Sequence, residues 1–308
     1  MLSEIFLIWL GLNVLAWMLS VAVFCLWALR VRWTAGGLMP DAVPFERGEG
    51  GDAVLFVHGF NDVPAVWRRF VEPFVEKDFH VEAVHLEGLG ERRLGLWFDF
   101  PLLRWQQAIT DRVNALAKTY RRVFLVGHSM GGALVLDAVC RHGHWRKDMP
   151  GAYAPVAGAA LLAPLVEVSR VRSPFLPAQA WFGICRMLLP GLRCVPSVFR
   201  PVQGAEDDPA FIYRRDRFMS VAVLGAMFGL VRRLRTLDLS GISTPLWVYV
   251  AGNDRVVDSS AAKSYFSSYP AMMACVEIPN VPHVLPLVTG WRDIADLIAS
   301  DFIRTPSA

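Results

Sequence analysis

The stretch Val123-Phe124-Leu125-Val126-Gly127-His128-Ser129-Met130-Gly131-Gly132-Ala133 decides the fold. Its first four residues form an apolar run that favours a short strand, and a pattern typical of a helix continues to Val139. Between them, Ser129 has a glycine two positions away on each side. A sharp strand-to-helix turn strains its central residue and needs small neighbours to close. The pattern therefore predicts a serine hydroxyl at a helix start, where unpaired N–H groups favour negative charge.

Further apolar runs on both sides of this turn are typical of strands in a parallel sheet, and helical patterns separate several of them. The runs are Ala53 to Val57, Phe79 to Leu86, Gly158 to Leu165, Pro245 to Ala251 and Met272 to Ile278. The helical patterns cover Val63 to Glu76, Arg104 to Tyr120 and Trp291 to Ile303. The alternation predicts an α/β fold with a mostly parallel sheet.

Three of the predicted strands end in polar motifs. His58-Gly59 follows the first strand, Gly252-Asn253-Asp254-Arg255-Val256-Val257 follows a later one, and Asn280-Val281-Pro282-His283 follows the last. Together with Gly-His-Ser-Met-Gly, these motifs resemble the α/β-hydrolase superfamily in their chain order. From Ala53 to Ser300 the elements resemble lipase-like members of the monoacylglycerol lipase, lysophospholipase and carboxylesterase type. The resemblance implies an α/β-hydrolase fold with a helical cap inserted in it.

The resemblance also implies the roles of five residues. Ser129 would be the nucleophile, His283 its general base, and Asp254 the carboxylate that orients the imidazole. The backbone N–H groups of Phe60 and Met130 would form the oxyanion hole. All three side chains follow predicted strands, so in a parallel sheet they would meet at one edge.

Two residues near these motifs receive other roles. Asp258 precedes Ser259-Ser260 and fits the N-cap of the next helix, which leaves Asp254 as the catalytic acid. His58 would orient the oxyanion loop or pack in the core, and would not be the base.

Glu87 to Arg93 lies where lipase-like relatives carry a Pro-Gly-His-Gly segment. This chain has a different sequence there, so the contacts that the relatives make at the rim of the active site cannot be transferred to it.

The first 33 residues are expected to anchor the chain in a membrane. No charged side chain occurs from Ile5 to Leu29, where the clearly polar residues are Asn13 and Ser20. About 20 apolar residues suffice to span a bilayer as a helix. The flanking residues differ from those of a signal peptide, which has a basic start and a small-residue cleavage site. A cleaved signal peptide and a helix lying flat in the membrane are the alternatives.

Charge and cysteine content bear on location and partners. Arg30 and Arg32 follow the apolar run, with no basic residue before it, which favours a cytoplasmic catalytic domain. The net charge is only +3, and no basic stripe is interleaved with aromatic residues, so nucleic acid is not an expected partner. The five cysteines lack the spacing of a metal site or a disulfide framework and are expected to be free thiols.

The 308 residues divide by composition into four parts. Residues 1–33 are the anchor and 34–52 a glycine- and proline-rich linker. Residues 53–165 and 241–308 are the hydrolase core, and 166–240, rich in proline and apolar residues, are the cap. An apolar cap favours a greasy substrate and the exclusion of water. It also fits a cap that only packs its own small core.

The sequence predicts a membrane-anchored serine hydrolase that cleaves carboxylic esters of a lipid-like kind, such as acylglycerols or lysophospholipids. The same triad also serves amidases, thioesterases and cofactor-free haloperoxidases, and a non-catalytic binding protein of this fold is a further alternative. No cofactor is expected. No metal is expected either, because His142 and His144, near a helix end, are typical of a solvated cap.

Overall fold

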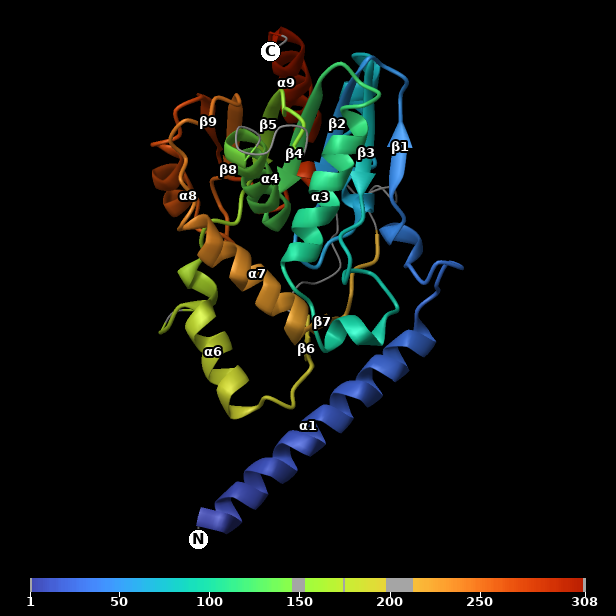
Figure 1. The fold of residues 1–308 in the computed structure, drawn as a ribbon, viewed down its shortest axis with the longest axis vertical. Helices are drawn as coiled ribbons and strands as arrows, with labels where there is room; N and C mark the ends of the chain where they lie inside the picture. The colour runs from blue at the N-terminus through green and yellow to red at the C-terminus, as the bar shows by residue number, and fades with distance from the viewer. Residues whose placement is uncertain (1, 146–152, 174, 198–212, 307–308) are drawn as a thin grey trace.

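A computed structural model of the chain describes residues 2–145, 153–173, 175–197 and 213–306. Its centre is a seven-stranded sheet in the order β1-β3-β2-β4-β5-β8-β9 (Figure 1). The strands are β1 (Phe45–Arg47), β2 (Asp52–Val57), β3 (Phe79–Val84), β4 (Val123–His128), β5 (Gly158–Leu162), β8 (Leu246–Ala251) and β9 (Met272–Ile278). All neighbours pair in parallel except β1, which is antiparallel to β3.

This order places the site. In a parallel sheet the carboxyl ends of the strands lie on one edge, and ligands bind there. The loops after β2, β4, β8 and β9, which carry the predicted site residues, therefore come together. The strands β2, β4, β5 and β8 are buried along their whole length, as their near-continuous apolar sequences predict.

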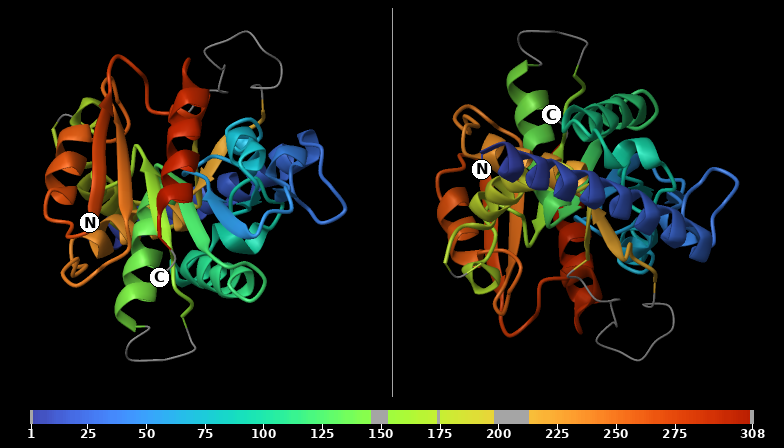
Figure 2. Two further views of the ribbon diagram at one scale, coloured as in Figure 1. Left: turned by 90° about the horizontal axis from the view of Figure 1, so that it is seen from above. Right: turned by 90° about the horizontal axis from the view of Figure 1, so that it is seen from below.

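Helices cover both faces of the sheet. Figure 2 shows α9 (Trp291–Arg304) on one face, and α3 (Leu103–Leu116) and α4 (Met130–Cys140) on the other. The short helix α2 (Glu72–Glu76) contacts α9, and α8 (Ser259–Phe266) contacts β8 and β9. The helix expected over 63–76 is broken into the 3-10 turn η2 (Pro64–Trp67) and α2, because Pro73 lacks the N–H that would continue the first turn.

The expected linker contains regular structure. Residues 34–52 include the 3-10 turn η1 (Pro40–Ala42) and the edge strand β1. After β3, the 3-10 turn η3 (Leu94–Trp97) leads to α3, and the π-helical turn η4 (Arg141–Trp145) extends α4. The turn η7 (Leu285–Leu287) precedes α9.

Between β5 and β8 the chain leaves the alternating pattern, as the sequence predicts. Residues 166–240 contain η5 (Arg170–Arg172), α6 (Ala178–Leu188), the antiparallel pair β6 (Cys194–Pro196) and β7 (Phe218–Ser220), and α7 (Val221–Leu234). The sequence pattern predicts two apolar helical stretches here, around Phe211 to Phe228 and Leu230 to Leu237. The described part of that range contains the strand β7 and one helix, α7, and residues 211–212 lie outside the described residues.

The chain begins with a long helix, α1 (Leu2–Arg30). Within it Ser3–Arg30 is long and apolar enough to cross a membrane, and no other helix among the described residues meets this test. Figures 1 and 2 show α1 running across the side of the molecule where α6 and α7 lie.

Candidate active site

The turn after β4 has the strained geometry that its sequence predicts. Ser129 has φ 55° and ψ −118°, a conformation that side chains other than glycine adopt at a cost of about 1–3 kcal/mol. A Cβ at Gly127 would lie 2.4 Å from the carbonyl oxygen of Gly131, and a Cβ at Gly131 would lie 2.1 Å from that of Val57. Both positions therefore require glycine for the turn to close. The hydroxyl of Ser129 consequently lies between β4 and α4.

The loop after β9 brings His283 to this hydroxyl. The ring nitrogen Nε2 of His283 lies 2.9 Å from Ser129 Oγ, and Nδ1 lies 2.6 Å from Asp254 Oδ2. Ser129 and His283 are 6% and 9% exposed. Three residues far apart in the chain thus form one hydrogen-bonded series, serine to histidine to aspartate, that is largely shielded from solvent.

Electrostatics keep Asp254 ionised. Burial by itself raises the pKa of this carboxyl, but hydrogen bonds from His283 and from the N–H groups of Val256 and Val257 outweigh burial and hold the pKa below its ordinary value. Asp258 has the other role expected for it: it caps α8 by accepting a hydrogen bond from the N–H of Ala261. The structure therefore pairs Asp254, rather than Asp258, with the histidine.

The predicted oxyanion donors flank the serine. Met130 is the first residue of α4, so its N–H has no acceptor within the helix. The loop after β2, which carries Phe60, passes beside the nucleophile turn, because a Cβ at Gly59 would lie 3.1 Å from Ser129 Cβ. The two backbone segments that carry the predicted donors therefore both adjoin Ser129.

Two fully buried histidines support these loops. Nδ1–H of His58 donates to the carbonyl of Gly59, and its Nε2 accepts from the N–H of Leu86, so the ring is neutral and joins the loops after β2 and β3. Nε2 of His128 lies 3.0 Å from the carbonyl oxygen of His283, so His128 supports the loop that carries His283. Burial lowers the pKa of His58 to about 4 and of His128 to about 3.

A second buried network holds the loop after β2 from the other side. Asp62 accepts hydrogen bonds from the hydroxyl of Tyr213 (2.6 Å) and the guanidinium of Arg215 (2.8 Å). The side chain of Arg215 is 8% exposed, so this ion pair is largely shielded from water. The network ties residues 213–216 to the oxyanion loop. Sequence reasoning missed it, since only the charge opposition of two distant residues could have indicated it.

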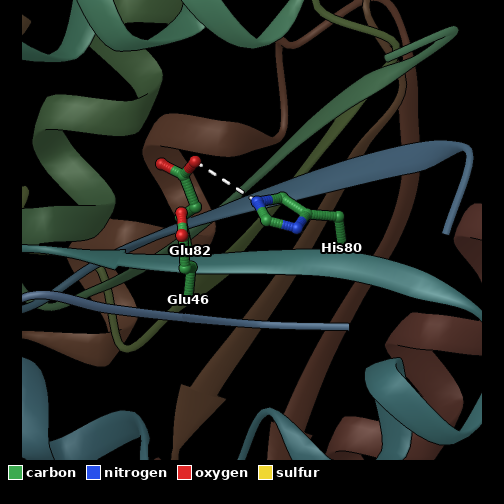
Figure 3. Close-up of side chains that lie close together, drawn as sticks. All are labelled: Glu46, His80 and Glu82. Carbon is green, nitrogen blue, oxygen red and sulfur yellow. Dashed lines mark hydrogen bonds and ion pairs between the residues drawn. The ribbon is translucent and has the colours of Figure 1, made fainter. Parts of the chain in front are cut away.

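One cluster among the described residues has the composition of a metal site. Glu46, His80 and Glu82 each offer a ligand atom, and these atoms lie within 4.8 Å of one another (Figure 3). Arg112, however, already bonds both carboxylate oxygens of Glu82. A metal ion would have to displace this guanidinium, and the ion pair accounts for the cluster by itself. At the other candidate, the ring of His142 is buried and lies 2.6 Å from a backbone carbonyl, contrary to the expected solvated cap.

Comparisons with known proteins agree with this architecture. The model of the Hydrolase_4 family, described as serine aminopeptidase, S33, matches residues 49–285. No curated protein sequence matches the chain. Solved structures are similar in fold at low identity. One, from work on the metagenome-derived lipolytic enzymes LipS and LipT, has a TM-score of 0.66 and 17% identity, over 87% of this chain and 99% of that one.

Two further structures are lipases. The monoacylglycerol lipase of Paleococcus ferrophilus has a TM-score of 0.65 and 17% identity, over 86% of this chain and 99% of its own. A soluble variant of the monoglyceride lipase of Saccharomyces cerevisiae, in complex with a substrate analog, has a TM-score of 0.66 and 13% identity, over 86% and 92%. The predicted α/β-hydrolase fold is confirmed. The chain belongs to the Hydrolase_4 family of α/β-hydrolases.

Proposed function

We propose that this protein is a serine hydrolase that cleaves carboxylic esters of a lipid-like kind, such as acylglycerols or lysophospholipids, through an acyl-enzyme. The observation that carries the proposal is the hydrogen-bonded series from Ser129 through His283 to Asp254, at 2.9 and 2.6 Å. Serine alone is a weak nucleophile at neutral pH, and an adjacent base activates it.

In the proposed mechanism each group has one step. Nε2 of His283 takes the proton of Ser129 Oγ as the oxygen attacks the ester carbonyl, and it returns that proton to the departing alcohol. The carboxylate of Asp254 accepts Nδ1–H and stabilises the charged imidazole. The N–H groups of Phe60 and Met130 bind the developing oxyanion, where losing one donor typically costs about 10²–10³ in rate. Water, activated by the same histidine, then hydrolyses the acyl-enzyme.

Two observations support a lipid-like substrate. The segment 166–240 carries exposed apolar side chains, among them Phe175 (87% exposed) and Met187 (69% exposed). Two structures similar in fold are monoglyceride lipases. A series of p-nitrophenyl esters and monoacylglycerols of increasing chain length tests the proposal. Here kcat/KM is expected to rise with acyl length, and a preference for acetate would contradict the lipid-like class.

Labelling tests the mechanism. A fluorophosphonate is expected to label the full chain in detergent, and Ser129→Ala is expected to abolish both labelling and ester hydrolysis without changing the melting temperature. Ser260→Ala serves as the matched control, because Ser260 is an exposed serine in the first turn of α8 and carries no proposed role in the chemistry. If Ser129→Ala kept its turnover, another residue would be the nucleophile.

Amide hydrolysis is the second candidate, because the matching family model is described as a serine aminopeptidase. The description of the matching family names neither thioesters nor the remaining alternatives. Aminoacyl p-nitroanilides separate the two candidates. Ester hydrolysis is preferred here, and a kcat/KM for an anilide above that for every ester would reverse this choice.

We further propose that α1 anchors the chain in the cell membrane, with the catalytic domain on the cytoplasmic side. Arg30 and Arg32 lie at the domain end of the apolar helix, which favours this orientation. The exposed thiol of Cys275 reports the orientation. An impermeant maleimide is expected to label it in lysates and not in intact cells, and labelling of intact cells would place the domain outside.

A further inference from the structure

The long helix α1 is packed against the domain along one side. Its buried residues Asn13, Ser20, Phe24 and Trp27 recur at intervals of three, four and seven, and so share one face of the helix. The ring of Phe24 meets that of Trp97 in η3 edge-on, at 4.7 Å between centroids. The helix is therefore part of the folded unit rather than a free tether.

The polar members of this face bind the backbone of the turn that joins α6 to β6. Asn13 Oδ1 accepts the N–H of Gly191 at 2.8 Å, and Ser20 Oγ accepts the N–H of Arg193 at 3.0 Å. These are the two clearly polar residues in the apolar part of α1. Each is thus used to satisfy a backbone donor of residues 166–240.

The other N–H groups of this turn have partners within the protein as well. The indole N–H of Trp9 donates to the carbonyl of Leu188 at 2.9 Å. The N–H of Leu189 donates to the carbonyl of Cys185 at 2.8 Å, and that of Leu192 to the carbonyl of Leu189 at 3.0 Å. The residue after Leu189 is a proline, so every backbone N–H from 189 to 193 has a partner. Unpaired N–H groups are costly in hydrocarbon, so this pairing of the donors favours insertion of the turn.

The contact between turn and helix is also unusually close. A Cβ at Gly191 would lie 2.0 Å from the carbonyl oxygen of Asn13. Only glycine allows the two backbones to approach in this way, and small residues at helix contacts are typical of packing in membranes. Position 191 is therefore determined by α1.

The outer surfaces on both sides of this contact are mostly apolar, and Arg186 is the one exposed charged side chain of α6. No side chain of α6 is fully buried, and Trp181, Met187 and Leu188 are 43%, 69% and 54% exposed. On α1, Leu12 and Leu19 are 53% and 56% exposed. Exposed apolar side chains gathered on two neighbouring helices mark a contact with a membrane or another protein. Continuity with a helix long enough to cross a bilayer identifies the membrane as the occupant.

We propose that α1 and α6 form one bilayer-contacting surface, joined through Asn13 and Ser20, so that residues 181–193 insert into the membrane beside the anchor. The proposal rests on the membrane anchoring proposed above and extends it from the helix to residues 166–240. The domain is then fixed at the membrane surface instead of being joined to the anchor by a flexible linker. A lipid ester can therefore enter it directly from the bilayer.

Two cysteines of the chain test this directly. Cys185 lies in α6 and Cys275 in β9, and both are exposed. The full chain is prepared in two variants that keep one of these thiols, with the other exposed cysteines replaced by alanine, in vesicles of phosphatidylcholine and phosphatidylglycerol. An impermeant, charged maleimide then reports accessibility, with Cys275 fixing the fraction of outward-facing chains. Labelling of Cys185 is expected to be at least about tenfold slower, because a charged reagent is excluded from hydrocarbon.

The labelling of Cys185, Cys275 and Ser129 separates the possible explanations. Equal labelling of the two thiols overturns the proposal. Protection of Cys185 that disappears at one chain per vesicle also overturns it, because a second copy would then be the occupant. Fluorophosphonate labelling of the same vesicles is scored separately. Labelled Ser129 with an accessible Cys185 refutes this inference alone, whereas a protected Cys185 without fluorophosphonate labelling refutes the hydrolase.

A variant of Asn13 tests whether Asn13 and Ser20 join α1 to the turn after α6. Asn13→Leu keeps the helix apolar but removes the acceptor of Gly191, so the turn is expected to detach and the labelling of Cys185 in vesicles to rise severalfold. Leu12→Ile, on the exposed side of the same helix turn, is the matched control and is expected to leave labelling unchanged. Protection that persists in Asn13→Leu, at the same level as in the control, would mean that the pair does not join the two helices.

Discussion

Asp216 is a buried carboxyl with a single partner. Its Oδ2 accepts the N–H of Gly90 at 2.6 Å, whereas Oδ1 has no hydrogen-bond partner. Burial raises its pKa from 3.8 to about 7, against the opposing effect of the bond from Gly90. Between these values the folded state holds a proton that the unfolded state has lost, so the stability contributed by this group decreases as pH rises through this window.

Replacing this carboxyl should therefore stabilise the protein at alkaline pH. For Asp216→Asn we expect a gain in the free energy of unfolding of about 2–4 kcal/mol at pH 8 and almost none at pH 4, because the protonated acid and the amide are both neutral. Chemical denaturation in detergent at both pH values measures the difference. An equal gain at the two pH values would show that charge burial is not the cause.

At the residue scale, sequence was most informative where a motif is local. Ser129, Asp254 and His283 were identified from the few residues around each, and the structure brings them within hydrogen-bonding distance. Their catalytic roles stay predictions. The pairing of Asp62 with Arg215 could not be predicted, because it depends on which loops meet at the sheet edge and not on any local pattern.

Among the elements, α3, α4 and α7 are joined by one buried carboxylate. Asp137 of α4 is fully buried and accepts hydrogen bonds from Gln106 of α3 (2.9 Å) and Arg141 (2.9 Å), and one from Arg233 of α7. Arg141 is itself only 6% exposed. The network therefore fixes α7, and with it part of residues 166–240, to the helix that follows Ser129.

Breaking this network should be costly. Asp137→Asn leaves two guanidinium groups without their counterion, one of them buried, so we expect a loss of about 3–5 kcal/mol in the free energy of unfolding. The matched control is Asp111→Asn, an exposed acid of α3 bonded to Gln107, with an expected change below about 0.5 kcal/mol. Urea denaturation compares the two, and similar losses would contradict the prediction.

Element boundaries were less predictable than element order. The sequence predicts the strand over Met272 to Ile278 and the helix beginning at Trp291 correctly, because each has a sustained apolar period. It extends the helix over 63–76 too far, because the effect of Pro73 competes with a favourable helical spacing. The residues expected to be a linker pair with β3 as strand β1, and such a three-residue edge strand has no distinctive pattern.

At the scale of the whole molecule, buried neutral histidines make the fold sensitive to acid. Burial lowers the pKa of His58 to about 4, of His128 to about 3 and of His142 to about 4, from 6.5. Above 6.5 these rings are neutral in both states. As pH falls from 6.5 through about 4, the unfolded state binds protons that the folded state excludes, so stability is lost.

We therefore expect the melting temperature of the full chain in detergent to be lower at pH 5 than at pH 7. Between pH 7 and pH 5 the protonation of Asp216 adds stability, but the three histidines together remove more. The decrease should accordingly be steeper in Asp216→Asn. A melting temperature that rises toward pH 5 would contradict the assignment of neutral rings.

The placement of α1 marks the limit of the sequence at this scale. Its apolar run predicts a helix long enough to span a membrane, which is what the structure contains. Its packing on the domain could not be predicted, since Asn13 and Ser20 read locally as two interruptions of an apolar run. Their partners lie 178 and 173 residues further along the chain.

That separation has a consequence for biosynthesis. If α1 enters the bilayer as it is translated, the turn at Gly191 emerges 178 residues after Asn13, a delay of roughly 10–35 s at about 5–20 residues per second. During this delay Nδ2 of Asn13 bonds the carbonyl of Trp9, and the hydroxyl of Ser20 bonds that of Ala16, so each polar group already has a partner within its own helix. Only the side-chain oxygens of Asn13 and Ser20 then lack their donors, the N–H groups of Gly191 and Arg193. The newly inserted helix is therefore stable in lipid until the later residues are synthesised and pack against it.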